Sequence, residues 1–164
     1  MSLLDHSGRR VLGRYLLFMV PASVGWEFAQ LPLYTLWETG TRADISLAAL
    51  HCSVGDWMIA VFSLALAAAL AGGREWPHQH YARAAILTVA IGLSYTVFSE
   101  WLNIELRQSW AYRDAMPRIP PLGTGLSPVL QWMVLPAFGL WWARRGLLAR
   151  LRPLAGEAEA GRNP

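Results

Sequence analysis

The sequence predicts an all-α, polytopic membrane protein: a bundle of four transmembrane helices with both termini in the cytoplasm. Hydrophobic residues make up 54% of the 164 residues, whereas only 15% are charged, against about 25% in an ordinary soluble domain. A soluble domain of this length needs a charged surface, because small domains have much surface for their volume. The composition therefore argues against a soluble secreted enzyme, a disordered chain and a disulfide scaffold, and the single cysteine allows no internal disulfide.

Four apolar stretches are each long enough to cross a bilayer, whose core of ~30 Å needs about 20 mostly apolar residues per helix. The first stretch contains one charged residue, Glu27; the second has Asp56 towards its start, and the third meets its first charge at Glu100. We expect one membrane domain over 1–152 and a disordered cytoplasmic tail over 153–164. The predicted spans cover residues 15–37, 48–71, 84–104 and 126–143.

The arginine residues set the orientation of these spans. All 14 basic residues are arginine. Ten of them precede the first span, lie between the second and third, or follow the fourth, and cytoplasmic segments carry the excess of basic residues. This distribution predicts that both termini are inside. The arginines expected on the opposite side are Arg42, Arg107, Arg113 and Arg118.

Polar side chains of the four spans fall at a similar depth. With a rise of 1.5 Å per residue, Glu27 and Gln131 lie roughly 20 Å from the nearest inner arginine of their spans. Asp56 and Glu100 lie roughly 27 and 25 Å from theirs. All four groups therefore belong to the outer third of the membrane, and the inner halves of the spans carry few polar groups. The pattern predicts a polar pocket open to the outer face and closed below by an apolar plug.

Helical spacing sorts the polar residues of each span onto one face, because residues three and four apart are neighbours on a helix. Four such faces at matched depth can meet in one cavity, and the irregular segment Pro117–Gly125 is expected to cover it as an external cap or a short re-entrant lid. The predicted faces are Glu27, Gln30, Tyr34 and Glu38; Cys52 and Asp56; Thr96, Glu100, Asn103 and Arg107; and Ser127 and Gln131.

Ionisable side chains inside a membrane are functional candidates by default. We predict that Glu27, the deepest and most desolvated carboxyl, is a proton donor, and that Asp56 or Glu100 acts as a base or stabilises a cation. The plain alternative for Glu27 is a protonated carboxyl that hydrogen-bonds a neighbouring helix, and for Asp56 a charge near a helix N-terminus. The residues predicted to bind a ligand are Gln30, Tyr34, His51, Asn103, Arg107 and Gln131, with Arg107 also able to pair with Glu100.

A metal site is not predicted, and neither is a cofactor. His51, Cys52 and Asp56 come nearest to one, because mixed histidine, cysteine and carboxylate ligands suit zinc, iron or copper. Their spacing matches no known metal signature, and the outer segments contain no second histidine. Expected partners are the lipid bilayer and a small apolar or lipid-like ligand, not nucleic acid, and a homodimer or a larger membrane complex is left open.

Two strings carry a resemblance to a known kind of protein. Trp26-Glu27-Phe28-Ala29-Gln30-Leu31-Pro32-Leu33-Tyr34 and Ser99-Glu100-Trp101-Leu102-Asn103 resemble those of small, uncharacterised four-helix bacterial inner-membrane proteins. The resemblance implies a multi-pass protein of the bacterial inner membrane over all but the tail, and implies no activity. A fainter likeness is to the emopamil-binding family of membrane sterol isomerases, which also combine Glu, His, Asn and Trp in a small helical bundle.

Three functions remain open from the sequence, and whether the protein is an enzyme is among the open points. The leading hypothesis is a pocket on the periplasmic side that binds a small or lipid-like molecule, with acid/base chemistry on a lipid-like or isoprenoid substrate if it is an enzyme. The second is an accessory subunit of a membrane complex, in which paired polar groups hold the helices together and leave no cavity. The third is a small metal or proton transporter.

Overall fold

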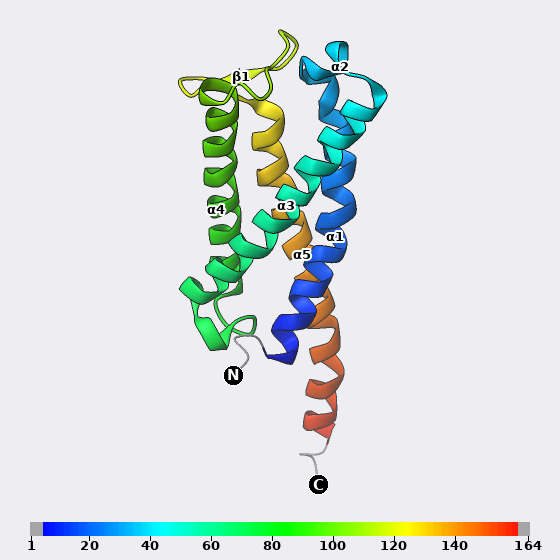
Figure 1. Cartoon of the computed structure of the whole chain (residues 1–164). Coiled ribbons are helices and arrows are strands. Elements are labelled where there is room, and N and C mark those ends of the chain that lie inside the picture. Colours follow the sequence, from blue (N-terminus) through cyan, green and yellow to red (C-terminus); the bar gives the residue numbers. More distant parts are fainter. Residues whose placement is uncertain (1–4, 161–164) are drawn as a thin grey trace.

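The protein is mostly helical, as the sequence predicts. A computed structural model describes residues 5–160, without the side chains of Arg74 and of residues 150–160. Figure 1 shows that α1, α4 and α5 run roughly lengthwise, with the first turns of α1 and the end of α5 at the same end of the molecule. The elements are α1 (His6–Gln30), η1 (Leu31–Leu33), α2 (Leu36–Thr39), α3 (Arg42–Ala71), η2 (Gly73–Glu75), α4 (Tyr81–Trp101), the π-helix η3 (Leu102–Leu106), β1 (Arg118–Ile119), β2 (Thr124–Gly125) and α5 (Leu126–Ala160).

Three helical segments of the described chain are long and apolar enough to cross a membrane: His6–Leu33, Arg42–Ala71 and Tyr81–Leu106. They correspond to the first three predicted spans and are consistent with a membrane protein. The described part of α5 is not among them. It contains Pro128, Gln131 and Pro136 in its first turns, which lower its apolar content.

The first helix begins and ends earlier than predicted. Asp5 caps it, because its Oδ1 accepts a hydrogen bond of 2.6 Å from the Gly8 N–H, and this capped start adds polar turns before Tyr15. The helix ends at Gln30, two residues before Pro32, which has no N–H to continue it. Trp37 therefore lies in the separate helix α2, and the single helix expected over 15–37 is wrong in its last third.

The long helices contact one another in four pairs. Both α1 and α4 contact α3 and α5. In Figure 1, α3 runs obliquely from beside α2 and the upper part of α1 to the lower part of α4. Because α3 runs obliquely, the N-terminal half of α3 lies away from the C-terminal half of α4 (Figure 1).

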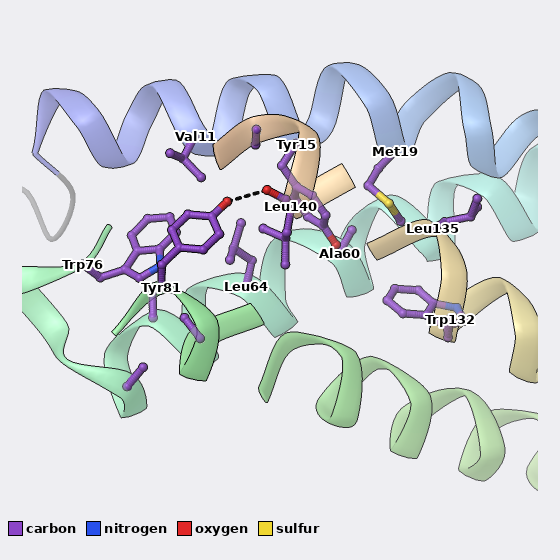
Figure 2. Packing of buried hydrophobic residues seen from close by; sticks show 14 residues of the cluster. Val11, Tyr15, Met19, Ala60, Leu64, Trp76, Tyr81, Trp132, Leu135 and Leu140 are labelled. Atoms are coloured by element: carbon purple, nitrogen blue, oxygen red, sulfur yellow. Dashed lines mark hydrogen bonds between the residues drawn. The ribbon is translucent and has the colours of Figure 1, made fainter. Parts of the chain in front are cut away.

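The lower half of the molecule is filled by a mainly apolar core, shown in Figure 2. Tyr15, Leu64 and Leu140 are almost fully buried there, and Tyr81 donates a 2.7 Å hydrogen bond from its hydroxyl to the Leu140 carbonyl. Trp132 lies at the end of this core opposite Trp76 (Figure 2).

Gly92 makes room for the Trp132 ring between α4 and α5. A Cβ atom at position 92 would lie 2.2 Å from Cε3 of Trp132, far closer than two carbon atoms can approach. Since Trp132 is almost fully buried, its ring has little space to move away. The small residue therefore lets the indole sit directly against the α4 backbone.

The predicted cap over Pro117–Gly125 contains a short antiparallel hairpin. Strands β1 and β2 pair Arg118 with Gly125 and Ile119 with Thr124. The chain before the hairpin is held to the end of α1 by a bridge between Tyr34 and Tyr112, whose ring centroids lie 5.3 Å apart.

At the other end of the chain, α5 continues to Ala160, beyond residue 153, where the composition predicts a disordered tail. The tail expected over 153–164 contains several good helix formers, Leu154, Ala155 and Glu157 among them, which are compatible with a helix. Residues 161–164 of that tail lie outside the described part of the chain.

Candidate functional site

A cavity of about 890 Å³ lies at the end of the molecule that carries α2 and the hairpin. This volume falls within the range of about 300–1,000 Å³ that is usual for small-molecule sites. Its walls come from α1, α2, α3, α4 and α5, so segments far apart in the sequence meet around it. The cavity brings together all the site residues predicted from the sequence, which are Glu27, Gln30, Tyr34, His51, Cys52, Asp56, Glu100, Asn103, Arg107 and Gln131.

Three helices meet at the amide of Gln131. Its Nε2 donates to Asp56 Oδ2 at 2.6 Å and to Glu27 Oε1 at 3.3 Å. Glu27 belongs to α1, Asp56 to α3 and Gln131 to α5, and all three side chains are buried. One amide group therefore holds two carboxyl groups side by side in the wall of the cavity.

A chain of hydrogen bonds extends from Glu27 along the interface of α1 and α5. Gln30 Nε2 donates to Glu27 Oε1 at 2.9 Å, and Gln30 Oε1 accepts from the Ser127 hydroxyl at 2.8 Å. Trp26 Nε1 in turn donates to the Ser127 hydroxyl at 3.2 Å. This series of hydrogen bonds fixes the orientation of the Gln30 amide: its nitrogen donates to Glu27, and its oxygen accepts from Ser127.

Glu100 lies in the wall formed by α4 and is held by Tyr112, which belongs to the segment before the hairpin. The Tyr112 hydroxyl donates to Glu100 Oε2 and accepts from the Gly125 N–H at 2.9 Å. Burial, followed by the neighbouring Glu100 carboxyl, raises the pKa of Tyr112, which keeps the hydroxyl protonated. Tyr112 thus links α4 to the hairpin. Sequence reasoning missed it, because a loop residue has no periodicity that would place it beside a helix face.

The predicted face of the first span is only partly correct. Glu27 and Gln30 share a face as expected, but Tyr34 follows the break at Pro32 and has an extended backbone. Tyr34 lines the cavity because the chain bends over it, and not because of helical spacing. Glu38 is not among the lining residues; it forms an ion pair of 2.5 Å with Arg113 at the surface.

The predicted face of the third span is retained through a change of helix type. Thr96 and Glu100 line the cavity from α4, and Asn103 and Arg107 line it from the π-helical turn and the residue after it. The predicted pair between Arg107 and Glu100 is absent from the ion pairs of the described residues. The wider π turn alters the register between positions 100 and 107, and Arg107 is exposed at the rim.

His51 and Cys52 line the rim of the cavity on α3, with His51 exposed and Cys52 partly buried. Within residues 5–160, no group of three or more His, Cys, Asp or Glu side chains is placed to hold a metal ion. Together with Asp56, these two residues are the nearest to a ligand set that the sequence offers, and they do not form such a group.

The side of the cavity between α3 and α4 is lined by exposed apolar side chains. Leu47 and Met58 on α3 are 65% and 69% exposed, and Tyr95 on α4 is 51% exposed. Sequence reasoning did not identify these residues as part of the site, because apolar residues in an apolar helix carry no signal of their own.

Trp132 closes the cavity towards the apolar core, since it both lines the cavity and belongs to the core cluster.

Comparison with protein-family models, with curated proteins and with solved structures finds no match to this chain. The cavity and the residues that line it are therefore what indicates the function of this chain.

Proposed function

We propose that the chain is a four-helix integral membrane protein of the bacterial inner membrane that binds a lipid-like molecule in this cavity. The observation that carries the proposal is a cavity of about 890 Å³ in which carboxyl groups from three different helices meet. Buried acids are costly in a membrane and are kept mainly where they serve a function. In this proposal α5 is the fourth span, and its contacts with α1 and α4 support that assignment.

The proposed orientation has both termini in the cytoplasm and the cavity in the periplasmic third of the bilayer. Support comes from the end of the molecule opposite the cavity, where arginines lie over aromatic rings. The Arg14 guanidinium lies 4.1 Å from the Trp142 ring centroid, and that of Arg145 lies 3.9 Å from the Trp141 ring centroid. Arginine and tryptophan side chains of this kind anchor helices at the interface, and arginine is enriched on the cytoplasmic side.

In the enzymatic form of this proposal, Glu27 donates a proton to the bound molecule, and Asp56 or Glu100 acts as base or stabilises a cation. The contact of Glu27 with both Gln30 and Gln131 supports a fixed position for its carboxyl. Fixed geometry is what proton transfer to a bound molecule requires. The same residues serve a binding protein without chemistry.

The accessory-subunit alternative expects polar groups that are paired off without a cavity, and the cavity volume favours a ligand site over it. The transport alternative expects polar groups along the inner half as well. The buried Ser63 and Thr88 hydroxyls there donate to carbonyls of their own helices. These two hydroxyls are satisfied within their own helices and do not favour this alternative.

The test is to purify the protein in a mild detergent and to identify co-purified molecules by native mass spectrometry and lipid extraction. We expect a bound molecule in the wild type, and a loss of binding or turnover in Glu27→Gln and Glu100→Gln with folding intact. The exposed acid Glu38 provides a matched control, Glu38→Gln, which should bind as the wild type does. Wild-type behaviour of both cavity variants would show that the carboxyls are only structural.

A further inference from the structure

The cavity has an apolar side and an acidic side, and each constrains the molecule that fills it. The apolar side lies between α3 and α4, where Leu47, Met58 and Tyr95 combine a place in the cavity wall with exposure on the outer surface of the helices. In a membrane this surface faces lipid chains. An apolar chain of a bound molecule can therefore leave the cavity sideways past Met58 and Tyr95, about two helical turns along α3 from the exposed His51.

The acidic side has no cation of its own. Glu27, Asp56 and Glu100 line the cavity, and none of the ion pairs of the described residues includes any of them. Arg107 and His51 also line the cavity, but both are exposed, and neither is in an ion pair with these carboxyls among the described residues. A positive group placed among these carboxyls would make charge-assisted hydrogen bonds, which are roughly twice as strong as neutral ones.

Other polar and aromatic groups of the same wall fit a positive group as well. The Thr96 hydroxyl is buried one helical turn from Glu100 and has no hydrogen-bond partner among the described residues. The aromatic residues Tyr34, Trp110 and Trp132 also line the cavity. Aromatic faces attract cations, most strongly where water is excluded.

From these observations, and resting on the proposed binding function, we infer that the occupant is a single-chain amine with a protonated nitrogen. Its ammonium group lies between the Glu27–Asp56 pair and Glu100, and its alkyl chain passes between α3 and α4 beside Met58 and Tyr95. Anionic amphiphiles are disfavoured by repulsion from the ionised carboxyl, Asp56 or Glu100, that acts as base in the proposed function. A neutral alcohol of equal length keeps the chain contacts and makes only the weaker, neutral hydrogen bonds.

The test uses three photoreactive probes of equal chain length, an alkylamine, an alkanol and a fatty acid, each with a diazirine at the chain end. The full chain is placed in nanodiscs of phosphatidylcholine, and labelling is read by intact mass and peptide mapping. We expect the amine to label with about tenfold higher apparent affinity than the alkanol, as one charge-assisted hydrogen bond can provide. The label should lie on α3 and α4 near Leu47, Met58 and Tyr95.

Two glycines provide a variant that blocks the cavity and a matched control. Gly55 lines the cavity and Gly25 does not, and a Cβ atom at either position meets no atom within 4 Å. Gly55→Phe should abolish labelling by the amine and the alkanol, whereas Gly25→Phe should leave both unchanged. The double variant Glu27→Gln, Asp56→Asn should lose the preference for the amine and keep labelling by the alkanol.

The possible outcomes separate the two proposals. Equal labelling by amine and alkanol, or strongest labelling by the fatty acid, overturns the inferred positive charge while the binding site stands. Amine labels spread evenly over all four long helices overturn the lateral path. Labelling that Gly55→Phe leaves unchanged for every probe overturns the proposed binding function itself.

Discussion

Gln131 Nε2 lies 2.6 Å from Asp56 Oδ2, and this contact joins α5 to α3 through the interior of the molecule. Both α3 and α5 pack against α1 and α4. In this arrangement α3 and α5 are diagonal to each other, with α1 and α4 between them. The hydrogen bond is therefore a direct tie across the middle of the helix arrangement, beside the cavity rather than within the apolar core.

Replacing Gln131 with leucine should destabilise the protein, because it removes the donor shared by Asp56 and Glu27. Breaking a buried hydrogen bond to a carboxyl typically costs about 1–3 kcal/mol. Thermal unfolding in detergent, followed by circular dichroism, measures the loss. Asn103→Leu is the control, because Asn103 donates to the Ser99 carbonyl and hydroxyl of its own chain segment; a midpoint as low as that of Gln131→Leu would contradict the tie.

The Tyr112 hydroxyl is expected to hold the hairpin over the cavity. Tyr112→Phe keeps the ring against Tyr34 but removes the hydroxyl that contacts Glu100 and the Gly125 N–H. We expect faster proteolysis within residues 107–125 and a stability loss of about 1–2 kcal/mol. Tyr95→Phe changes a half-exposed tyrosine and should match the wild type; equal protease sensitivity of both variants and the wild type would refute the assignment.

The contact between Gly92 and Trp132 should be intolerant of a single added methyl group. Gly92→Ala places a Cβ atom against the buried indole, and overpacking of this kind typically costs about 1–3 kcal/mol. Gly25→Ala meets open space and should be neutral or slightly stabilising, because alanine favours helix by about 1 kcal/mol over glycine. Tryptophan fluorescence during thermal unfolding compares the two, and an unaltered midpoint for Gly92→Ala would argue against the close contact.

The proposed topology can be tested with single cysteines. In a Cys52→Ser background, a cysteine at Asp114 should react with a membrane-impermeant maleimide added to intact spheroplasts. A cysteine at Gln79 should react only after the membrane is opened. Both positions belong to segments between the long helices, so their chemistry is comparable. Labelling of both from outside, or of neither, would contradict four spans with both termini in the cytoplasm.

Helical spacing predicted the site where the helices are regular, and failed where they end. Glu27 and Gln30 are correctly placed on one face of α1, whereas Tyr34 and Glu38 are not, because Pro32 ends the helix between them. The π-helical turn after Trp101 has the same effect on Arg107, whose pairing with Glu100 is not found. Tyr34, Asn103 and Arg107 still line the cavity, but a local change of geometry alters which contacts the residues after it can make.

The sequence could not reveal how the segment before the hairpin contributes to the site. Tyr112 reaches Glu100 because the segment before the hairpin folds back against Tyr34. No periodic pattern links a loop to a helix face, so its contacts depend on the tertiary arrangement alone. Depth along each span, by contrast, follows from counting residues, and it correctly gathers Glu27, Asp56, Glu100 and Gln131 around one cavity.

The indole of Trp132 closes the cavity towards the core, and Gly92 leaves that indole little freedom to move. In the proposed orientation, the carboxyls exchange protons with the periplasmic side only. Their protonation then follows the pH of that compartment and is insensitive to the proton gradient across the membrane. Occupancy by a titratable ligand would likewise respond to acidification outside the cell and not to changes in cytoplasmic pH.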